Sequence, residues 1–290
     1  SAEGIKKVIT PKTKAVCLVH MCGGMADMDS ILKVINDHKL ILVEDAGQSF
    51  SSSYKGTYTG LFGKAGCYSF DFFKIATAGE GGVLVTNDEE TYKKADVYSD
   101  HGHSHIGAVR GMEEHPYLGF NYRISELHAA VGVAQTRRVP QIREKNRKNK
   151  NYLTSLLSSV KGIAFAKLAD PDGDSATCLN LLLPNTEITQ QVVNEMKANG
   201  VVGFDYWYKN MYHFINQWDH IKELKTVSKL PIEIFGAPQD YKNLNLPKTQ
   251  ETIGRLISFG IKYKWTEEDM KTLATKITEC VNKVMSTVNV

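Results

Sequence analysis

The sequence predicts an α/β fold whose first part contains a mixed, mostly parallel sheet. Residues 14–20 and 40–43 are apolar runs typical of buried strands, and residues 29–38 between them have the spacing of an amphipathic helix. A strand, a helix and a second strand in this order predict a parallel crossover unit. Ligands bind at the carboxyl ends of strands in open α/β sheets, so Asp45, which follows the second run, is expected at the functional site.

Shorter segments complete the first part of the chain. Residues 51–64 are polar and contain several glycines and tyrosines, which indicates a loop or an irregular hairpin. Short strands are expected at 66–70 and 83–86, on either side of Lys74 and a Gly-Glu-Gly-Gly sequence. The helices predicted in the whole chain are 29–38, 87–99, 125–138, 141–159, 189–199 and 266–286.

The second half of the chain changes character. Residues 163–166 and 178–183 are predicted antiparallel strands around an Asp-Pro-Asp-Gly-Asp loop, and residues 201–208 are a further strand that leads into an aromatic cluster. The boundary is placed near residue 150, on a basic helix. The prediction is therefore a large domain at 1–149 and a small α/β domain at 150–290.

Composition excludes several classes of function. The 290 residues carry 35 basic and 32 acidic side chains, interspersed, and a formal net charge of +3, which argues against nucleic-acid binding. No apolar run reaches the roughly 18 residues that cross a bilayer, and we see no signal-peptide pattern. The five cysteines are scattered, mostly in apolar runs, as reduced thiols are. We therefore expect a soluble, cytoplasmic protein with no membrane or nucleic-acid partner.

Asp45 and Lys74 match two groups on which a pyridoxal 5′-phosphate (PLP) enzyme depends. A carboxylate keeps the pyridine nitrogen of the cofactor protonated, and a lysine in a semi-buried site forms a Schiff base with its aldehyde. Lys74 stands beside Phe72, Phe73 and Ile75, which is unusual company for a surface lysine. Each residue also has an ordinary interpretation, because Asp45 could cap a turn and Lys74 could extend its amine into water.

A phosphate group requires hydroxyl and backbone N–H donors. Ser69, five residues before Lys74, offers a hydroxyl on the strand that leads into the lysine loop. Gly79, Gly81 and Gly82 allow the backbone to approach a ligand closely, although they are equally consistent with a plain turn.

Taken together, these segments resemble a known family. VEDAGQSF, then GCYSFDFFK, then GEGG and TND, are similar to the sugar aminotransferases, PLP enzymes of the aspartate-aminotransferase-like fold (fold type I) that act on keto sugars. The resemblance implies a PLP-dependent transferase-like large domain. It assigns Asp45 to the pyridinium nitrogen and places Gln48 beside the ring or its phenolic oxygen. It assigns Ser69 to the phosphate and Lys74 to the Schiff base. GFNYRISELHAA further implies that Asn121 reaches the phosphate of a neighbouring subunit, in a homodimer with shared active sites.

Longer segments narrow the resemblance. VHMCGGMADMD, SDHGHSHIG and FDYWYKNMYHFINQWDHIKELK are similar to the subgroup of 8-amino-3,8-dideoxy-manno-octulosonate aminotransferases of lipopolysaccharide biosynthesis. These enzymes convert 8-oxo-Kdo to 8-amino-Kdo, with glutamate as amino donor. A sugar-acid substrate implies a basic or hydrogen-bonding pocket, for which the candidates are His101, His103, His105, Arg123 and Arg255. Histidines at alternate positions also suggest a metal site, but no cysteine stands at ligand spacing beside them, so we predict a polar lining and no metal.

Three alternatives and one departure accompany this resemblance. One branch of the family replaces the lysine with histidine and dehydrates its substrate, so Lys74 favours transamination. A nucleotide-linked keto sugar is the alternative substrate, and a non-catalytic PLP-fold relative is the alternative class of protein. The family also carries a phosphate-binding segment ahead of the position of Ser1. We therefore expect the N-terminal part of the fold to be missing from this sequence.

Overall fold

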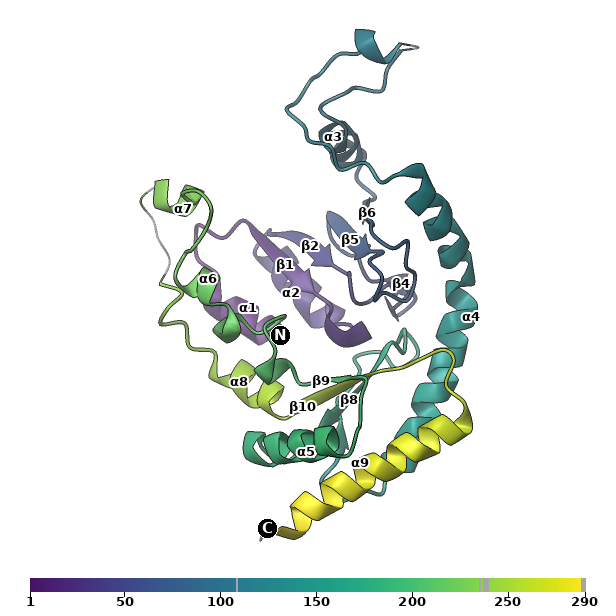
Figure 1. Cartoon of the computed structure of the whole chain (residues 1–290). Helices are drawn as coiled ribbons and strands as arrows, with labels where there is room; N and C mark the ends of the chain where they lie inside the picture. The colour runs from purple at the N-terminus through teal and green to yellow at the C-terminus, as the bar shows by residue number, and fades with distance from the viewer. Residues whose placement is uncertain (108, 235, 237–239, 288–290) are drawn as a thin grey trace. The chain divides into compact units, whose positions relative to one another are not determined.

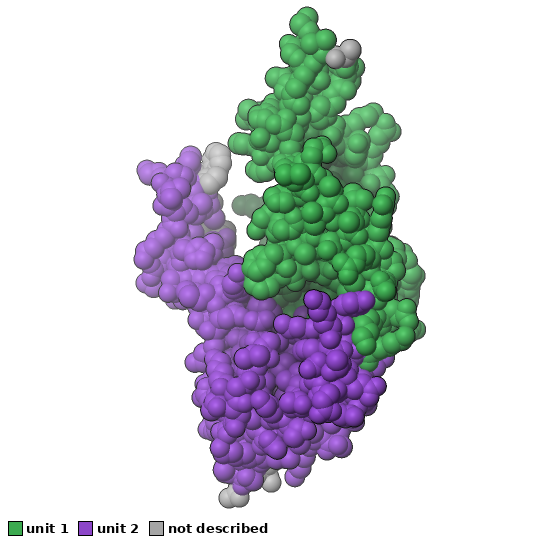
Figure 2. Space-filling model, turned by 45° about the vertical axis from the view of Figure 1, so that its right-hand side comes forward, with its two compact units in different colours: residues 1–148, 167–177 green, residues 149–166, 178–290 purple. Residues whose placement is uncertain are grey.

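The computed structural model describes residues 1–107, 109–234, 236 and 240–287. The chain divides into two compact units, drawn in green and purple in Figure 2. Unit 1 consists of residues 1–148 and 167–177, and unit 2 consists of residues 149–166 and 178–290. The elements of unit 1, labelled in part in Figure 1, are α1 (Ala2–Val8), β1 (Ala15–Val19), η1 (Met21–Gly23), α2 (Met28–Asp37), β2 (Ile41–Asp45), β3 (Ser53–Tyr54), β4 (Thr57–Tyr58), β5 (Ala65–Ser69), β6 (Gly82–Val85), α3 (Glu89–Ser99), η2 (Arg110–Met112) and most of α4 (Glu126–Leu157).

The sheet of unit 1 has four strands in the order β1-β2-β5-β6. Strands β1 and β2 are parallel, with Val19 beside Asp45, and β2 and β5 are parallel, with Asp45 beside Cys67. Strand β6 runs antiparallel to β5. The sheet is therefore mixed and mostly parallel, which confirms the predicted fold class and the crossover through α2.

One face of this sheet carries the core of unit 1. Met28, Ile31 and Ile35 of α2 pack with Leu42 and Tyr54 in one buried cluster. The helix begins one residue earlier than predicted because the side chain of Asp27 accepts the N–H of Ser30 at its N-terminus.

The opposite face of the sheet is uncovered by the residues that the structure describes. Val19, Asp45, Cys67 and Leu84 stand in one row across the four strands. Val19 is 47% exposed and Leu84 is 48% exposed. The predicted cofactor acid therefore lies in a row of otherwise apolar side chains and cysteine on the open face of the sheet.

Helix α4 is continuous where the sequence predicted two helices, at 125–138 and 141–159. Pro140 lies inside it. A proline removes one backbone hydrogen bond and kinks a helix without necessarily ending it when the neighbouring turns are packed. Val139 and Ile142, on either side, are both buried. Packing therefore overrides the local signal for a break.

Residues 167–177 belong to unit 1, whereas the predicted boundary placed them in the second domain. The N–H of Ser53 donates to Gly173 O at 2.8 Å, and the N–H of Lys55 donates to Asp170 Oδ2 at 2.7 Å. A Cβ atom at position 173 would lie 1.7 Å from Ser53 O, so this contact requires glycine. The loop is thus fixed to the β3–β4 hairpin by contacts that linear order does not reveal.

Unit 2 contains a second sheet, in the order β7-β8-β10-β9, whose paired strands are all antiparallel. The core cluster of unit 2 includes the buried residues Leu181, Val192, Ile257, Phe259 and Ile277. No helix in the described part of the chain has both the length and the apolar character needed to cross a membrane. The elements of unit 2, after the end of α4, are β7 (Ala164–Phe165), β8 (Cys178–Leu182), α5 (Thr186–Ala198), β9 (Phe204–Asp205), η3 (Trp207–Lys209), η4 (Ile215–Gln217), α6 (Asp219–Lys222), α7 (Pro231–Ile234), α8 (Pro247–Gly254), β10 (Leu256–Gly260) and α9 (Glu267–Thr287).

Two predictions for unit 2 need correction. Helix α5 begins three residues before the predicted residue 189, because Asn185 caps it by accepting the N–H of Ile188 at 2.8 Å. The strand predicted at 201–208 is reduced to Phe204–Asp205, which pairs with β10, a strand that the sequence did not predict.

Candidate functional site

The carboxyl ends of β2 and β5 bring Asp45 and Ser69 to either side of Gly47. The register places Asp45 beside Cys67, so Ser69, two residues further along β5, lies on the same face. The Gly47 N–H donates to Asp45 Oδ1 at 2.9 Å. A Cβ atom at position 47 would lie 3.0 Å from that oxygen and 3.6 Å from Ser69 Cβ. Glycine therefore keeps the space between the carboxylate and the hydroxyl free of a side chain.

Lys74 lies in a compact loop after β5. The loop closes through a backbone bridge between Asp71 and Gly79, and the Lys74 N–H donates to Asp71 O at 3.1 Å. Phe72 and Phe73, expected from the sequence to surround Lys74, are 64% and 76% exposed, and their ring centroids lie 3.9 Å apart. The described residues thus leave Lys74 half-buried.

Gln48 connects the loop after β1 to the loop after β2. Its Oε1 accepts the N–H of Cys22 at 2.9 Å. Cys22 is held in a left-handed conformation, with φ of 55°. One residue further on, Gly23 O accepts the hydroxyl of Ser52 at 2.8 Å. The side chain assigned to the cofactor ring by resemblance is therefore held in place on the same loop as Asp45 and Gly47.

Glu44 forms a buried polar centre on the covered face of the sheet. Its two carboxylate oxygens accept three backbone N–H groups of the 60–63 turn at 2.7–2.8 Å, and Oε2 lies 3.1 Å from His20 Nε2. Burial by itself raises the pKa of Glu44, but the hydrogen bonds from His20 and the turn outweigh it and hold that pKa below its usual value. Neighbouring residues on a strand face opposite ways, so Asp45 faces the open side of the sheet. The buried contacts of Glu44 therefore fix the backbone that carries Asp45.

Asp100 is the centre of the histidine-rich loop. Its Oδ1 accepts from Arg110 Nη2 at 2.6 Å and Arg123 Nη1 at 2.8 Å, and lies 3.1 Å from His101 Nδ1. Its Oδ2 lies 3.0 Å from His105 Nε2. Only 6% of the Asp100 side chain is exposed. The Arg110 guanidinium, above all, holds the pKa of Asp100 well below its usual range, although burial opposes this.

Residues 100–107 and 109–123, here named the arm, leave the rest of unit 1 beside α3 and return to α4 (Figure 1). The two legs of the arm meet at its base. The His101 N–H donates to Phe120 O at 3.0 Å, and Asp100 and Asn121 form an antiparallel bridge. A Cβ atom at Gly102 would lie 2.1 Å from a backbone oxygen of the returning leg. Asp100 therefore joins the start of the arm to its end.

Further out along the arm, His103 Nδ1 lies 3.3 Å from Glu113 Oε2 and 3.1 Å from His115 Nε2. Ligand atoms of Asp100, His101 and His103 lie within 4.8 Å of one another, as they do in some metal sites. However, two guanidinium groups already bind the Asp100 carboxylate and disfavour a further cation there. We therefore assign this cluster to holding the arm and retain the prediction of no metal.

The remaining candidates are Asn121 and Arg255. Asn121 is exposed, and its Oδ1 accepts the N–H of Arg123 at 3.3 Å. Arg255 belongs to unit 2, where its Nε donates to Leu183 O at 2.7 Å and its Nη1 lies 3.9 Å from Glu251.

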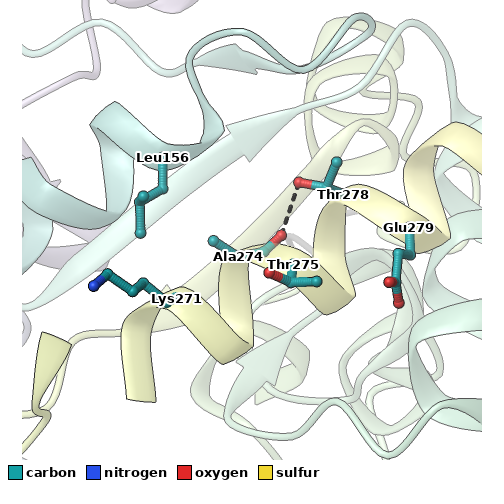
Figure 3. Close-up of a pocket in the computed structure, with 6 residues that line it drawn as sticks. All are labelled: Leu156, Lys271, Ala274, Thr275, Thr278 and Glu279. Carbon is teal, nitrogen blue, oxygen red and sulfur yellow. Dashed lines mark hydrogen bonds between the residues drawn. The ribbon is translucent and has the colours of Figure 1, made fainter. Parts of the chain in front are cut away.

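Unit 2 has a hollow of about 230 Å³ beside α9 (Figure 3). The hydroxyl of Thr278 donates to Ala274 O at 2.8 Å, so it is engaged within its own helix. The lining shows no cluster of groups suited to catalysis. It consists of Leu156, Lys271, Ala274, Thr275, Thr278 and Glu279.

Residues 1–278 match the model of the DegT/DnrJ/EryC1/StrS aminotransferase family. The chain belongs to this family. PLP is the cofactor typical of its members. The match to the family model extends over both units. The second half of the chain therefore resembles the family, as do the loops around Asp45 and Lys74.

Three relatives illustrate the range of the family. The chain is 37% identical over 145 residues to a GDP-perosamine synthase of Caulobacter vibrioides (48% of this chain, 37% of that protein). It is 33% identical over 168 residues to a putative L-glutamine:3-amino-2,3-dideoxy-scyllo-inosose aminotransferase of Streptoalloteichus tenebrarius (58% and 39%). It is 26% identical over 296 residues to the uncharacterized protein MJ1066 of Methanocaldococcus jannaschii (99% and 70%). The chain thus spans less than two fifths of the length of the first two relatives.

Solved structures confirm the fold over the whole chain. An aminotransferase from Psychrobacter cryohalolentis superposes with a TM-score of 0.82 and 24% identity, covering 98% of this chain and 73% of that one. An E. coli GDP-4-keto-6-deoxy-D-mannose-3-dehydratase with bound hydrated PLP has a TM-score of 0.77 and 19% identity, covering 96% and 70%. Because the fold contains both an aminotransferase and a dehydratase, fold alone does not decide the reaction.

The described residues fit PLP as a ligand. The acid and the hydroxyl that the family pattern requires lie on either side of a glycine whose Cβ would fill the space between them. The lysine follows on the loop after the strand that carries Ser69. PLP binding uses an acid at the pyridine nitrogen, a hydroxyl at the phosphate and an amine at the aldehyde. Asp45, Ser69 and Lys74 offer these three kinds of group.

Sequence reasoning missed two functional centres. Glu44 had a usable signal, because an acid next to Asp45 on a strand must face the covered side and therefore needs buried partners. The structure shows that His20, which ends the preceding strand run, is one of these partners. The contact between Asp100 and Arg110 had no such signal, since it depends on the path of an irregular arm.

Proposed function

We propose that this chain forms the PLP-binding part of an aminotransferase that converts a keto or aldehyde sugar into an amino sugar. The observation that carries the proposal is the pair of Asp45 and Ser69 around Gly47, with Lys74 on the adjoining loop. Asp45 holds the proton on the pyridine nitrogen, and Ser69 donates to the phosphate. Lys74 holds the aldehyde carbon and moves a proton at the substrate carbon. When bound, PLP supplies the electron sink.

We propose a nucleotide-linked keto sugar as the first candidate substrate and 8-oxo-Kdo as the second. The names of the relatives favour a nucleotide-linked keto sugar, since GDP-perosamine synthase is among them and a related structure was solved with its TDP-sugar product. The segments quoted from the arm and from unit 2 support 8-oxo-Kdo, with glutamate as donor. Half-reactions with the two substrates, started from the aminated cofactor, decide between them.

We also propose that the active protein is a homodimer through the arm. Its apolar side chains are unusually exposed, with Ile106 at 79%, Met112 at 83% and Leu118 at 84%. Exposed apolar surface on this scale is typical of protein interfaces. A second copy of the chain is the occupant expected, because Asn121 stands at the base of the arm and matches the residue that the family supplies to a neighbouring site.

A non-catalytic role is the second candidate, favoured by one observation. The chain is 33% identical over 170 residues to a protein of Geobacillus stearothermophilus named pleiotropic regulatory protein (58% of this chain, 44% of that protein). Titration of the purified chain with PLP, followed by addition of glutamate, separates the two roles. An aminotransferase shows a visible absorbance band that glutamate bleaches. A chain that binds no PLP, or whose band glutamate leaves unchanged, contradicts the proposed function.

A further inference from the structure

Asp100 is a buried acid at the base of the arm, where the two legs of the arm meet and two cationic side chains contact it. The Asp100 side chain is 6% exposed, whereas those of Arg110 and Arg123 are 51% and 43% exposed. Both guanidinium groups bind the same oxygen, Asp100 Oδ1. Charge-assisted bonds of this length are among the stronger polar contacts in proteins. The acid therefore restrains two otherwise mobile side chains from a position inside the base of the arm.

The same acid is tied by its backbone to Asn121. Asp100 and Asn121 form an antiparallel bridge, and the Asn121 side chain accepts the N–H of Arg123. The Asp100 carboxylate thus closes a ring of contacts: carboxylate to Arg123, Arg123 backbone to Asn121 side chain, and Asn121 backbone to Asp100. Such a ring fixes the orientation of the Asn121 amide, which is otherwise exposed.

We propose that Asp100 is a positioning residue, which acts through Arg123 to orient Asn121 toward the phosphate of PLP in a second copy of this chain. This inference rests on the proposed function and goes beyond it. It assigns a role to an acid that touches neither substrate nor cofactor. It also gives Arg123 and His105 the task of anchoring the arm, rather than of binding a sugar carboxylate.

The first test compares Asp100→Asn with Glu113→Gln. Both variants remove one charge from the arm, but Glu113 contacts His103 and the His105 N–H, outside the ring. Apparent PLP affinity, measured by absorbance titration, is expected to fall about tenfold in Asp100→Asn, the effect of losing roughly one charge-assisted bond. Glu113→Gln is expected to stay within about threefold. Equal affinities in Asp100→Asn and wild type overturn the inference.

The second test asks in which subunit Asp100 acts. Asp100→Asn chains are mixed and reassociated with Lys74→Ala chains, each inactive or weak alone. If Asp100 acts across the dimer, a mixed dimer has one site that combines an intact Lys74 with an intact arm, and activity reappears at up to about a quarter of wild type, for random pairing of equal amounts. A merely structural role within one subunit gives no recovery, and that result overturns the inference.

Two further measurements keep failure of this inference distinct from failure of the proposed function. Amide hydrogen exchange on the apo chain is expected to rise at residues 120–123 in Asp100→Asn and to stay unchanged in α2, which shows that the variant is folded. Should Asp100→Asn fail to fold, Arg123→Lys replaces it, with the same expected loss of PLP affinity. Wild-type chain that binds no PLP overturns both proposals, whereas PLP binding that is unaffected by these variants overturns this one alone.

Discussion

Replacing Glu44 by glutamine is expected to destabilise unit 1, although the side chain keeps its shape. The amide oxygen can still accept the two N–H groups that now bind Oε1, from Phe62 and Gly63. The amide nitrogen cannot accept, so the N–H of Gly60, now 2.8 Å from Oε2, faces a donor. His20 can accept from the new amide only by moving its proton to Nδ1, and Nδ1 could then no longer accept the Ala26 N–H, which now lies 3.4 Å away.

The expected loss is about 2–4 kcal/mol in the free energy of unfolding. One unsatisfied buried donor costs about 1–3 kcal/mol, and the loss of charge assistance in the remaining bonds adds about 1 kcal/mol. The site offers no relief through solvent, because the side chains of Glu44 and His20 are both fully buried.

The measurement must report on unit 1 alone. All three tryptophans lie in unit 2, so their fluorescence does not serve. Amide hydrogen exchange in β1 and β2 gives the opening free energy of the affected strands directly. The matched control is Glu89→Gln on the surface of α3, whose pair with Lys93 is solvated and whose removal is expected to leave the opening of β1 and β2 unchanged. A change below about 1 kcal/mol in β1 and β2 for Glu44→Gln refutes the reasoning.

Three other predictions follow from the site and the arm. Lys74→Ala is expected to reduce turnover about 10²–10⁴-fold, because it removes the proton-transfer group. Turnover is measured as release of the keto acid. Asp45→Asn is expected to weaken PLP binding about tenfold in an absorbance titration, because the amide does not hold the ring nitrogen charged. The pKa of His105 is raised by Asp96 and then by Asp100. The stability that His105 gives the arm is therefore complete below the unfolded pKa of about 6.5 and is lost as pH rises through the raised folded value. Hydrogen exchange of residues 101–107, corrected for intrinsic rates, should show this loss as the pH rises above about 6.5, and an unchanged profile contradicts it.

The fold of unit 1 was largely predictable because its signals are local. The apolar runs at 14–20 and 40–43 do form strands, and the helix between them requires a parallel crossover. Their predicted burial is wrong for one face, because alternate residues of both strands are exposed in the described structure. The helix expected at 87–99 is α3, which Asp88 caps by accepting the Thr91 N–H at 2.8 Å. Where local propensity and tertiary packing agree, pattern reasoning succeeds.

Features that depend on distant contacts could not be predicted in this way. Strand β10 pairs with residues more than 50 positions earlier in the chain, on both of its sides. Helix α4 continues through Pro140 because its neighbours are packed. The sequence suggested that Phe72 and Phe73 help to bury Lys74, but both rings are exposed. A linear pattern does not say on which side of a loop an aromatic ring lies.

The candidate site shows the same division. Asp45, Ser69 and Lys74 follow strand ends in a fixed spacing, so the sequence could propose them together. The position of Asp45 and Ser69 on either side of Gly47 required coordinates, because it depends on the register of β2 against β5. The histidines of the arm were recognised as a group, but their partner Asp100 was not. Asp100 pairs with arginines that lie 10 and 23 residues later in the chain, and ion pairs at such separations produce no periodic pattern in the sequence.

Borohydride reduction of the PLP-loaded chain, followed by peptide mapping, tests the central claim most directly. Reduction fixes the cofactor to whichever amine holds it. The account predicts a single pyridoxyl label on Lys74, with the label lost in Lys74→Ala and its yield lowered in Asp45→Asn. A label on another lysine, or a chain that takes up PLP equally well without Asp45 and Lys74, contradicts the claim that these two residues hold one cofactor.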